Sequence, residues 1–99
     1  MTTPIKLIIA DDEMLIRTGL KIMLEASGNV EVLALAESGR AAFEACKEHR
    51  PDVVLMDIRM PESNGIEGTK LIKEAFPEVK VLIVTTFQDT EYIVEAVQN

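Results

Sequence analysis

The sequence predicts an α/β fold in which a doubly wound parallel sheet is covered by helices on both faces. Short apolar runs alternate along the chain with segments whose apolar residues recur every three to four positions. Strands that are buried on both faces have such runs, and their alternation with helical patterns is typical of βαβ units. The 99 residues suit one domain, so we expect a single domain over residues 1–99.

The first half of the chain contains two predicted strands, each followed by a helix. Ile5–Ala10 is the first apolar run, and apolar residues at helical spacing then predict a helix from about residue 13 to 26. The second strand is predicted over Val30–Ala36. Ser38 is the expected N-cap of the next helix, which should end near residue 50, just before a proline.

The second half continues this alternation. Val53–Met56 is the third predicted strand, and the helix that follows should be closed by Pro77. The apolar stripe of that helix consists of Gly68, Leu71, Ile72 and Ala75. The fourth strand is predicted over Val79–Thr85, and Asp89 or Thr90 is the expected cap of a last helix. In the loop before the third helix, the Asn64-Gly65 pair is expected to form a turn in which glycine supplies a positive φ.

Acidic residues directly follow two of the predicted strands. Asp11, Asp12 and Glu13 follow the first strand, and Asp57 follows the third. One strand order puts these two strands side by side, at the switch point where a doubly wound sheet binds its ligand. Carboxylates a few ångströms apart repel by roughly 4 kcal/mol per pair at an effective dielectric near 20, so all stay ionised only with a cation between them. The pattern therefore predicts a metal site.

The residue types favour magnesium and phosphoryl chemistry. An all-oxygen site without Cys or His suits a hard cation, and Mg²⁺ commonly takes one or two carboxylates together with phosphate oxygens. A carboxylate beside such an ion is able to attack a phosphoryl donor, which would make Asp57 an aspartyl phosphate. A hydroxyl from Thr85 or Thr86, at the end of the fourth strand, is expected to donate to its oxygens. Taken alone, Asp57 would more often be a simple turn residue; the acidic triplet at the matching strand end favours the chemical role.

Composition excludes several classes of function. The net charge of −7 argues against nucleic-acid binding by this segment, because phosphate contacts require clustered Lys and Arg. No stretch reaches the roughly 20 apolar residues of a membrane span, and the first residues lack the pattern of a secretory signal. We therefore expect no membrane partner and a cytoplasmic location. Cys46, the single cysteine, is expected to be an inert packing residue.

These motifs resemble the receiver domain of bacterial two-component response regulators, in the NarL/FixJ (LuxR-type) group. The likeness extends over residues 4–99. The residues that carry it are the Asp11-Asp12 pair, the segment Asp57-Ile58-Arg59-Met60-Pro61, Gly65 and Thr85. The resemblance implies a flavodoxin-like receiver fold with the strand order 2-1-3-4.

The resemblance also implies a role for each matching residue. Asp57 would be the phosphoacceptor and Thr85 the switch hydroxyl. Mg²⁺ would be held by Asp11, Asp12, Asp57 and the backbone carbonyl of Arg59. The implied function is a signalling switch rather than an enzyme: a sensor histidine kinase phosphorylates Asp57 in a Mg²⁺-dependent reaction, and the receiver regulates a transcriptional output domain. DNA binding would belong to that downstream domain, which these residues do not include.

Receivers normally continue through a fifth strand and helix, with a phosphate-pairing lysine, and this sequence ends before both. The fourth strand is then expected to be an apolar edge, so we expect a homodimer, or an oligomer that exchanges the last helix. Two alternatives stay open. One is an oligomerising fragment that does not depend on phosphorylation. The other is a phosphatase of the haloacid-dehalogenase type, which needs an acid two positions after its nucleophile, where this sequence has Arg59.

Overall fold

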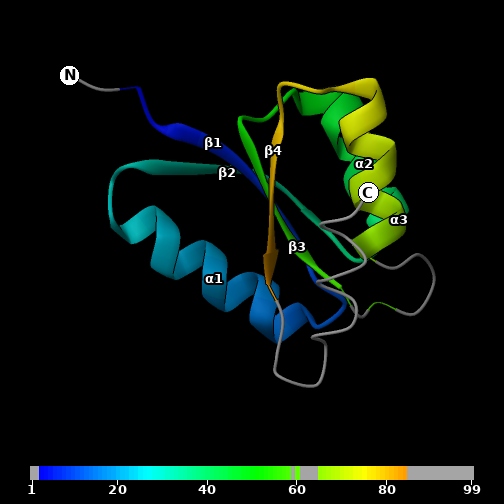
Figure 1. Cartoon of the computed structure of the whole chain (residues 1–99). Coiled ribbons are helices and arrows are strands. Elements are labelled where there is room, and N and C mark those ends of the chain that lie inside the picture. Colours follow the sequence, from blue (N-terminus) through cyan, green and yellow to red (C-terminus); the bar gives the residue numbers. More distant parts are fainter. Residues whose placement is uncertain (1–2, 59, 61–64, 85–99) are drawn as a thin grey trace.

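The computed structural model describes residues 3–58, 60 and 65–84. In chain order the elements are β1 (Ile5–Ala10), α1 (Met14–Ala26), β2 (Val30–Ala36), α2 (Gly39–His49), β3 (Val53–Asp57), α3 (Gly65–Ala75) and β4 (Lys80–Val84). The strands form one sheet, with α1 on one face and α2 and α3 on the other (Figure 1). None of the helices in these ranges is long and apolar enough to cross a membrane.

The sheet confirms the predicted fold class. Its strand order is β2-β1-β3-β4, and the three neighbouring pairs are all parallel. β2 therefore lies on one side of β1, whereas β3 and β4 lie on the other side, as the predicted order 2-1-3-4 requires. This is the kind of position at which doubly wound sheets bind ligands.

Element boundaries differ from the prediction by a residue or two. The fourth strand begins at Lys80, because the Val79 N–H closes a turn onto the Phe76 carbonyl at 3.0 Å. The third strand is one residue longer than predicted, since Asp57 pairs with Val84 and so belongs to β3. The end of the predicted fourth strand at Thr85 and the predicted last helix lie outside the described residues.

The core consists of two apolar layers that share β1. Ile8 and Ala10 belong to the larger layer under α2 and α3, whereas Leu7 and Ile9 belong to the smaller layer under α1. Successive residues of a strand point to opposite faces, so a strand covered on both sides is apolar at every position. Burial on both faces fixes the register of β1, because a slip of one residue would exchange its two sets of side chains.

The sequence predicts the N-cap of α2 correctly. The Ser38 hydroxyl accepts a hydrogen bond from the Ala41 N–H at 3.0 Å, in the usual geometry of a serine cap. At its other end, α2 stops at Arg50, whose φ of 49° is left-handed. This conformation ends the helix and leads the chain through Pro51 into β3.

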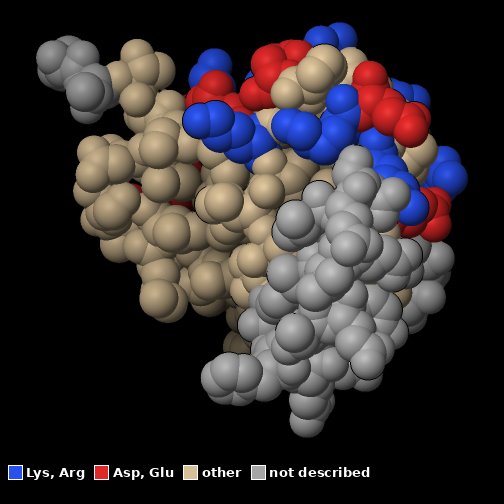
Figure 2. Space-filling model, in the orientation of Figure 1, with Lys and Arg blue, Asp and Glu red and all other residues tan. Residues whose placement is uncertain are grey.

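An apolar surface remains exposed on the α1 side of the molecule. Leu15 and Met23 on α1 are 82% and 70% exposed, and Leu82 and Val84 on β4 are 56% and 43% exposed. In Figure 2 the surface over α1 is mostly tan, while Lys, Arg, Asp and Glu gather over the end of the sheet where β4 begins. β4 is the outer strand of the described sheet, and its exposed side chains Leu82 and Val84 are apolar.

Candidate functional site

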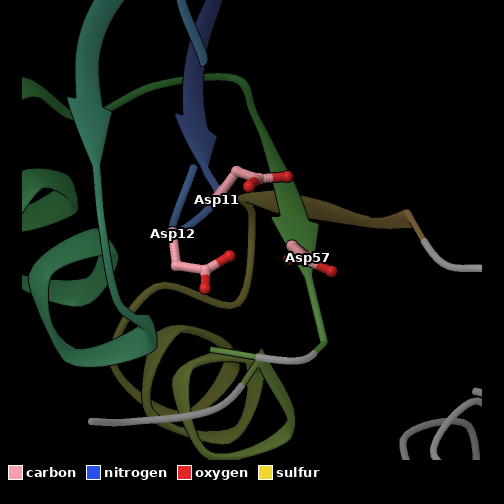
Figure 3. Close-up of side chains that lie close together, drawn as sticks. All are labelled: Asp11, Asp12 and Asp57. Carbon is pink, nitrogen blue, oxygen red and sulfur yellow. The ribbon is translucent and has the colours of Figure 1, made fainter. Parts of the chain in front are cut away.

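Three carboxylates converge at the carboxyl edge of the sheet. Asp11, Asp12 and Asp57 each offer one oxygen atom, and these three atoms lie within 4.8 Å of one another. Figure 3 shows Asp11 and Asp12 in the segment that leaves β1 and Asp57 at the end of β3, with their side chains gathered around one space. The structure thus brings together three of the four acids that the sequence places at the ends of the first and third strands, and Glu13 is not one of the three.

The register of the parallel strands produces this arrangement. Ala10 of β1 pairs with Met56 of β3, so Asp11 and Asp57 are the next residues on two neighbouring strands. The Asp11 N–H continues the ladder on the other side, donating to the Ala36 carbonyl of β2 at 3.0 Å. This bond ties the backbone of Asp11 to β2, and Asp11 is only 8% exposed.

The three acids differ in their access to solvent. Asp11 is buried, Asp57 is half-buried and Asp12 is exposed. The Oδ1 atom of Asp11 accepts a hydrogen bond from the Glu13 N–H at 2.9 Å, which closes the turn into α1. An ion would thus reach the cluster from the side of Asp12 and meet a fixed, buried carboxylate on the far side.

Gly65 makes a contact with β3 that the sequence analysis missed. The prediction gave Gly65 a turn with positive φ, and this was wrong: Gly65 is the first residue of α3. Its N–H donates to the Ile58 carbonyl at 2.9 Å. A Cβ atom built at this position would lie 2.2 Å from the Asp57 carbonyl oxygen, so only glycine fits without a shift. Sequence offers no separate signal, because a loop glycine and a helix-starting glycine look alike.

Two predicted site residues, Thr85 and Arg59, lie outside the described residues. The nearest described position to Thr85 is Val84, which pairs with Asp57 in the β3–β4 ladder. Cys46 is buried within the larger core layer, and burial raises the pKa of its thiol to about 11. This protonated, enclosed thiol agrees with the expected packing role.

The donor set fits a hard divalent cation. Mg²⁺ binds oxygen at about 2.0–2.1 Å, so two ligands on opposite sides of it lie roughly 4.2 Å apart. Three ligands of an octahedral ion include at least two adjacent pairs, whose oxygens lie roughly 2.9 Å apart, so oxygens within 4.8 Å of each other need a shift of up to about 2 Å or a water molecule between one carboxylate and the ion. The three ligand atoms are carboxylate oxygens, which Mg²⁺ prefers over softer donors.

Comparison with known families gives a match over nearly the whole chain. A family described as the response regulator receiver domain matches residues 7–99. The chain is 53% identical over 95 residues to the transcriptional regulatory protein LnrK of Bacillus subtilis, covering 96% of this chain and 43% of LnrK. It is 41% identical over 95 residues to the oxygen regulatory protein NreC of Staphylococcus haemolyticus, covering 95% of this chain and 44% of NreC. The chain thus spans less than half the length of these relatives.

Solved structures give the same result. The response regulator domain of Thermotoga maritima CheB superposes with a TM-score of 0.88 at 33% identity, over 97% of this chain and 72% of that one. A DNA-binding response regulator of the LuxR family from Staphylococcus aureus superposes with a TM-score of 0.86 at 35% identity, over 95% of this chain and 78% of that one. Both likenesses include the strands that carry the acidic cluster.

Proposed function

The chain belongs to the response regulator receiver family, in its LuxR/NarL-type group, and from this we propose that it is a phosphoacceptor switch of a two-component system with Asp57 as the acceptor. We treat residues 1–99 as one receiver domain. The observation that carries the proposal is the position of Asp57 at the end of β3, within 4.8 Å of oxygens from two other acids. The Asp57 residue is half-buried.

The proposed reaction is a transfer from a phosphohistidine of a sensor kinase. A carboxylate oxygen of Asp57 bonds to phosphorus, the bond from phosphorus to the histidine nitrogen breaks, and that nitrogen keeps the electron pair and takes a proton. Mg²⁺, when bound by Asp11, Asp12, Asp57 and the Arg59 backbone carbonyl, supplies positive charge that offsets the charge of the carboxylate and of the phosphoryl oxygens. Hydrolysis of the acyl phosphate returns Asp57 to its starting state, so the domain assists its own chemistry without being an enzyme for other substrates.

Thr85 is proposed as the switch hydroxyl, which donates to a phosphoryl oxygen on Asp57. The support for this role is the pairing of Val84 with Asp57, since Val84 directly precedes Thr85. A hydrogen bond to a charged group contributes about 1.5–3 kcal/mol. A difference of that size between two conformations changes their ratio by tenfold or more, which is enough for a signal.

The proposed partners follow from the family and the relatives. A sensor histidine kinase is the phosphoryl donor. LnrK is named as a transcriptional regulator and is more than twice as long as its matched part, so we assign DNA binding in the parent protein to a domain outside the receiver. These partners put the activity in the cytoplasm.

Self-association through β4 is also proposed. β4 is the outer strand of the described sheet, and its Leu82 side chain is 56% exposed. A second copy offers the same edge, so antiparallel pairing about a two-fold axis would join the two sheets. Sedimentation should detect a dimer that Leu82→Lys weakens, whereas a monomer at high concentration would contradict this interface. Exchange of the last helix is the related arrangement, and that helix lies outside the described residues.

Phosphoryl uptake tests the main proposal. The protein is incubated with a phosphorylated kinase or with acetyl phosphate, with and without Mg²⁺, and its intact mass is measured. The wild type should gain one phosphoryl group only with Mg²⁺, and Asp57→Asn should gain none while remaining folded. Asp52→Asn is the matched control, because Asp52 lies just before the other end of β3, where its carboxylate accepts from the Lys6 N–H at 2.9 Å. Uptake by Asp57→Asn would contradict the assignment.

The metal assignment has its own test. Asp12→Ala removes the exposed carboxylate and should weaken Mg²⁺ binding sharply, as measured by calorimetry. Equal affinity would remove Asp12 from the ligand set. Uptake that is unchanged without Mg²⁺ would contradict the metal requirement, and turnover of a phosphomonoester would favour the phosphatase alternative.

A further inference from the structure

A guanidinium group from α1 holds the acidic segment that leaves β1. Arg17 lies in the first turn of α1, and its Nη1 atom donates to the backbone carbonyl of Asp11 at 2.7 Å. The bond is short and partly buried, and its donor is charged. Hydrogen bonds with one charged partner are about twice as strong as neutral ones. Arg17 therefore adds a substantial constraint to this segment.

Three hydrogen bonds together fix Asp11. Its N–H donates to the Ala36 carbonyl at 3.0 Å, and its Oδ1 atom accepts from the Glu13 N–H at 2.9 Å. The bond from Arg17 fixes the remaining backbone group, the carbonyl. Because a peptide unit is planar, fixing this carbonyl also fixes the plane that joins Asp11 to Asp12.

The orientation of that plane determines where the Asp12 side chain points. Asp12 is exposed, so its direction depends on its backbone more than on packing. We propose that Arg17 is a positioning residue of the cation site, which aims the Asp12 carboxylate by fixing the peptide between Asp11 and Asp12. This inference rests on the proposed function, since it requires that the acids hold a cation.

Charge and position predict opposite effects of removing Arg17. As a positive charge near three carboxylates, Arg17 opposes a cation, so its removal should strengthen Mg²⁺ binding by Coulomb's law alone. As a positioning residue it favours binding, so its removal should weaken it. The sign of the change in affinity therefore distinguishes the two roles.

The experiment titrates the whole chain with MgCl₂ and follows backbone amide shifts by NMR. Arg17→Met removes both donor and charge at similar helix propensity, and Arg17→Lys keeps both. Lys21→Met is the charge control: Lys21 lies one turn further along α1 and pairs with Glu25 at 2.8 Å. Thermal unfolding without Mg²⁺ measures the stability of each variant separately.

We expect Arg17→Met to weaken Mg²⁺ binding by about tenfold or more, the usual effect of losing a group that orients a metal ligand. Arg17→Lys should recover much of the affinity, and Lys21→Met should not weaken it. In the metal-free protein, the Asp12 and Glu13 amide shifts should move in Arg17→Met and stay in Lys21→Met.

Equal or tighter binding by Arg17→Met, in a titration where the wild type binds, would overturn the positioning role and leave the proposed function intact. No binding by the wild type would overturn both. Should Arg17→Met fail to fold, Arg17→Gln serves as the second variant. Its amide is too short to reach the Asp11 carbonyl in the same way, so weaker binding is again expected and tighter binding refutes the inference.

Discussion

Replacing Gly65 by alanine tests how closely α3 packs against the strand that carries Asp57. The new methyl group would lie 2.2 Å from the Asp57 carbonyl oxygen and 2.8 Å from the Ile58 Cα atom. Both neighbours are backbone atoms and cannot rotate away. Asp57 is also held by its pairing with Val84, so relief requires a movement of α3 or of the end of β3. Ordinary contact begins near 3.5 Å, which makes that movement about 1 Å.

The magnitude follows from two opposing terms. Forcing extra atoms into a close-packed contact typically costs about 1–3 kcal/mol, and sometimes more. The higher helix propensity of alanine offsets at most about 1 kcal/mol of this cost. Because both close neighbours are backbone atoms, the upper end of the packing cost applies, and after the helix-propensity offset we expect a net loss of roughly 2 kcal/mol, which for a domain of this size corresponds to a fall in Tm of about 8–16 °C.

The assay is thermal and urea unfolding of Gly65→Ala beside two other glycine variants. Gly19 on α1 has nothing within 4 Å of its built Cβ, so Gly19→Ala should raise stability by about 0.5–1 kcal/mol. At Gly68 the built Cβ lies 2.7 Å from the Gly39 Cα atom, so Gly68→Ala should also destabilise, without touching β3.

Phosphoryl uptake separates the two destabilised variants. Gly65→Ala should slow uptake more than Gly68→Ala at comparable stability, because of the two glycines only Gly65 lies against the backbone of Asp57, the proposed acceptor. If Gly65→Ala is as stable as the wild type while Gly19→Ala is stabilised, the close contact between α3 and β3 is not real and the reasoning fails.

Three further predictions concern the helices and the core. Ser38→Ala removes the cap bond to the Ala41 N–H and should cost about 1 kcal/mol in urea unfolding; no loss would show that the cap contributes nothing. Burial raises the pKa of Cys46 from 9.0 to about 11, so the thiol ionises in the unfolded chain at a lower pH than in the folded one. The free energy of unfolding should therefore fall as pH rises from 9 to 11. Cys46→Ala should lack that fall, and an identical pH profile for the two proteins would contradict the reasoning. The pKa of Glu25 is lowered by its hydrogen bond from Lys21 and by one from a backbone N–H of β2. The ionised Glu25 therefore stabilises the folded state above pH 4.5, and this stabilisation is lost as the pH falls below that value. Glu25→Gln should therefore be less stable than the wild type at pH 6, and the difference should shrink as the pH falls below 4.5, whereas a constant difference would refute the linkage.

The strands were predictable because their signal is local. β1 and β3 are apolar at nearly every position since each is covered on both faces, and this pattern is visible without knowing what covers them. The acids are also a local signal, because they directly follow these apolar runs. That Asp11 and Asp57 share one edge depends on strand order, which the residues alone left open and the family resemblance supplied; the observed pairing of Ala10 with Met56 agrees with it.

The supports of the site were not predictable, because they depend on packing between distant segments. Gly65 excludes a side chain on account of the Asp57 carbonyl, and no pattern around Gly65 reports how close another strand will come. The bond from Arg17 to the Asp11 carbonyl depends in the same way on the turn between β1 and α1. Spacing along a helix shows which side chains share a face and does not show which backbone atom they reach.

The electrostatics of the site and the packing of the sheet are linked through the register of β1. Three carboxylates within 4.8 Å repel one another, and the simplest relief would be to move their strands apart. The core opposes such a movement, because displacing β1 would take Ile8 and Ile9 out of the two core layers that bury them. The backbone bonds of Asp11 and the contact of Gly65 hold the ends of β1 and β3 in the same way. The apolar core and these backbone contacts therefore oppose separation of the three acids, so in the proposed switch Mg²⁺ would meet carboxylates whose backbone is already held in place.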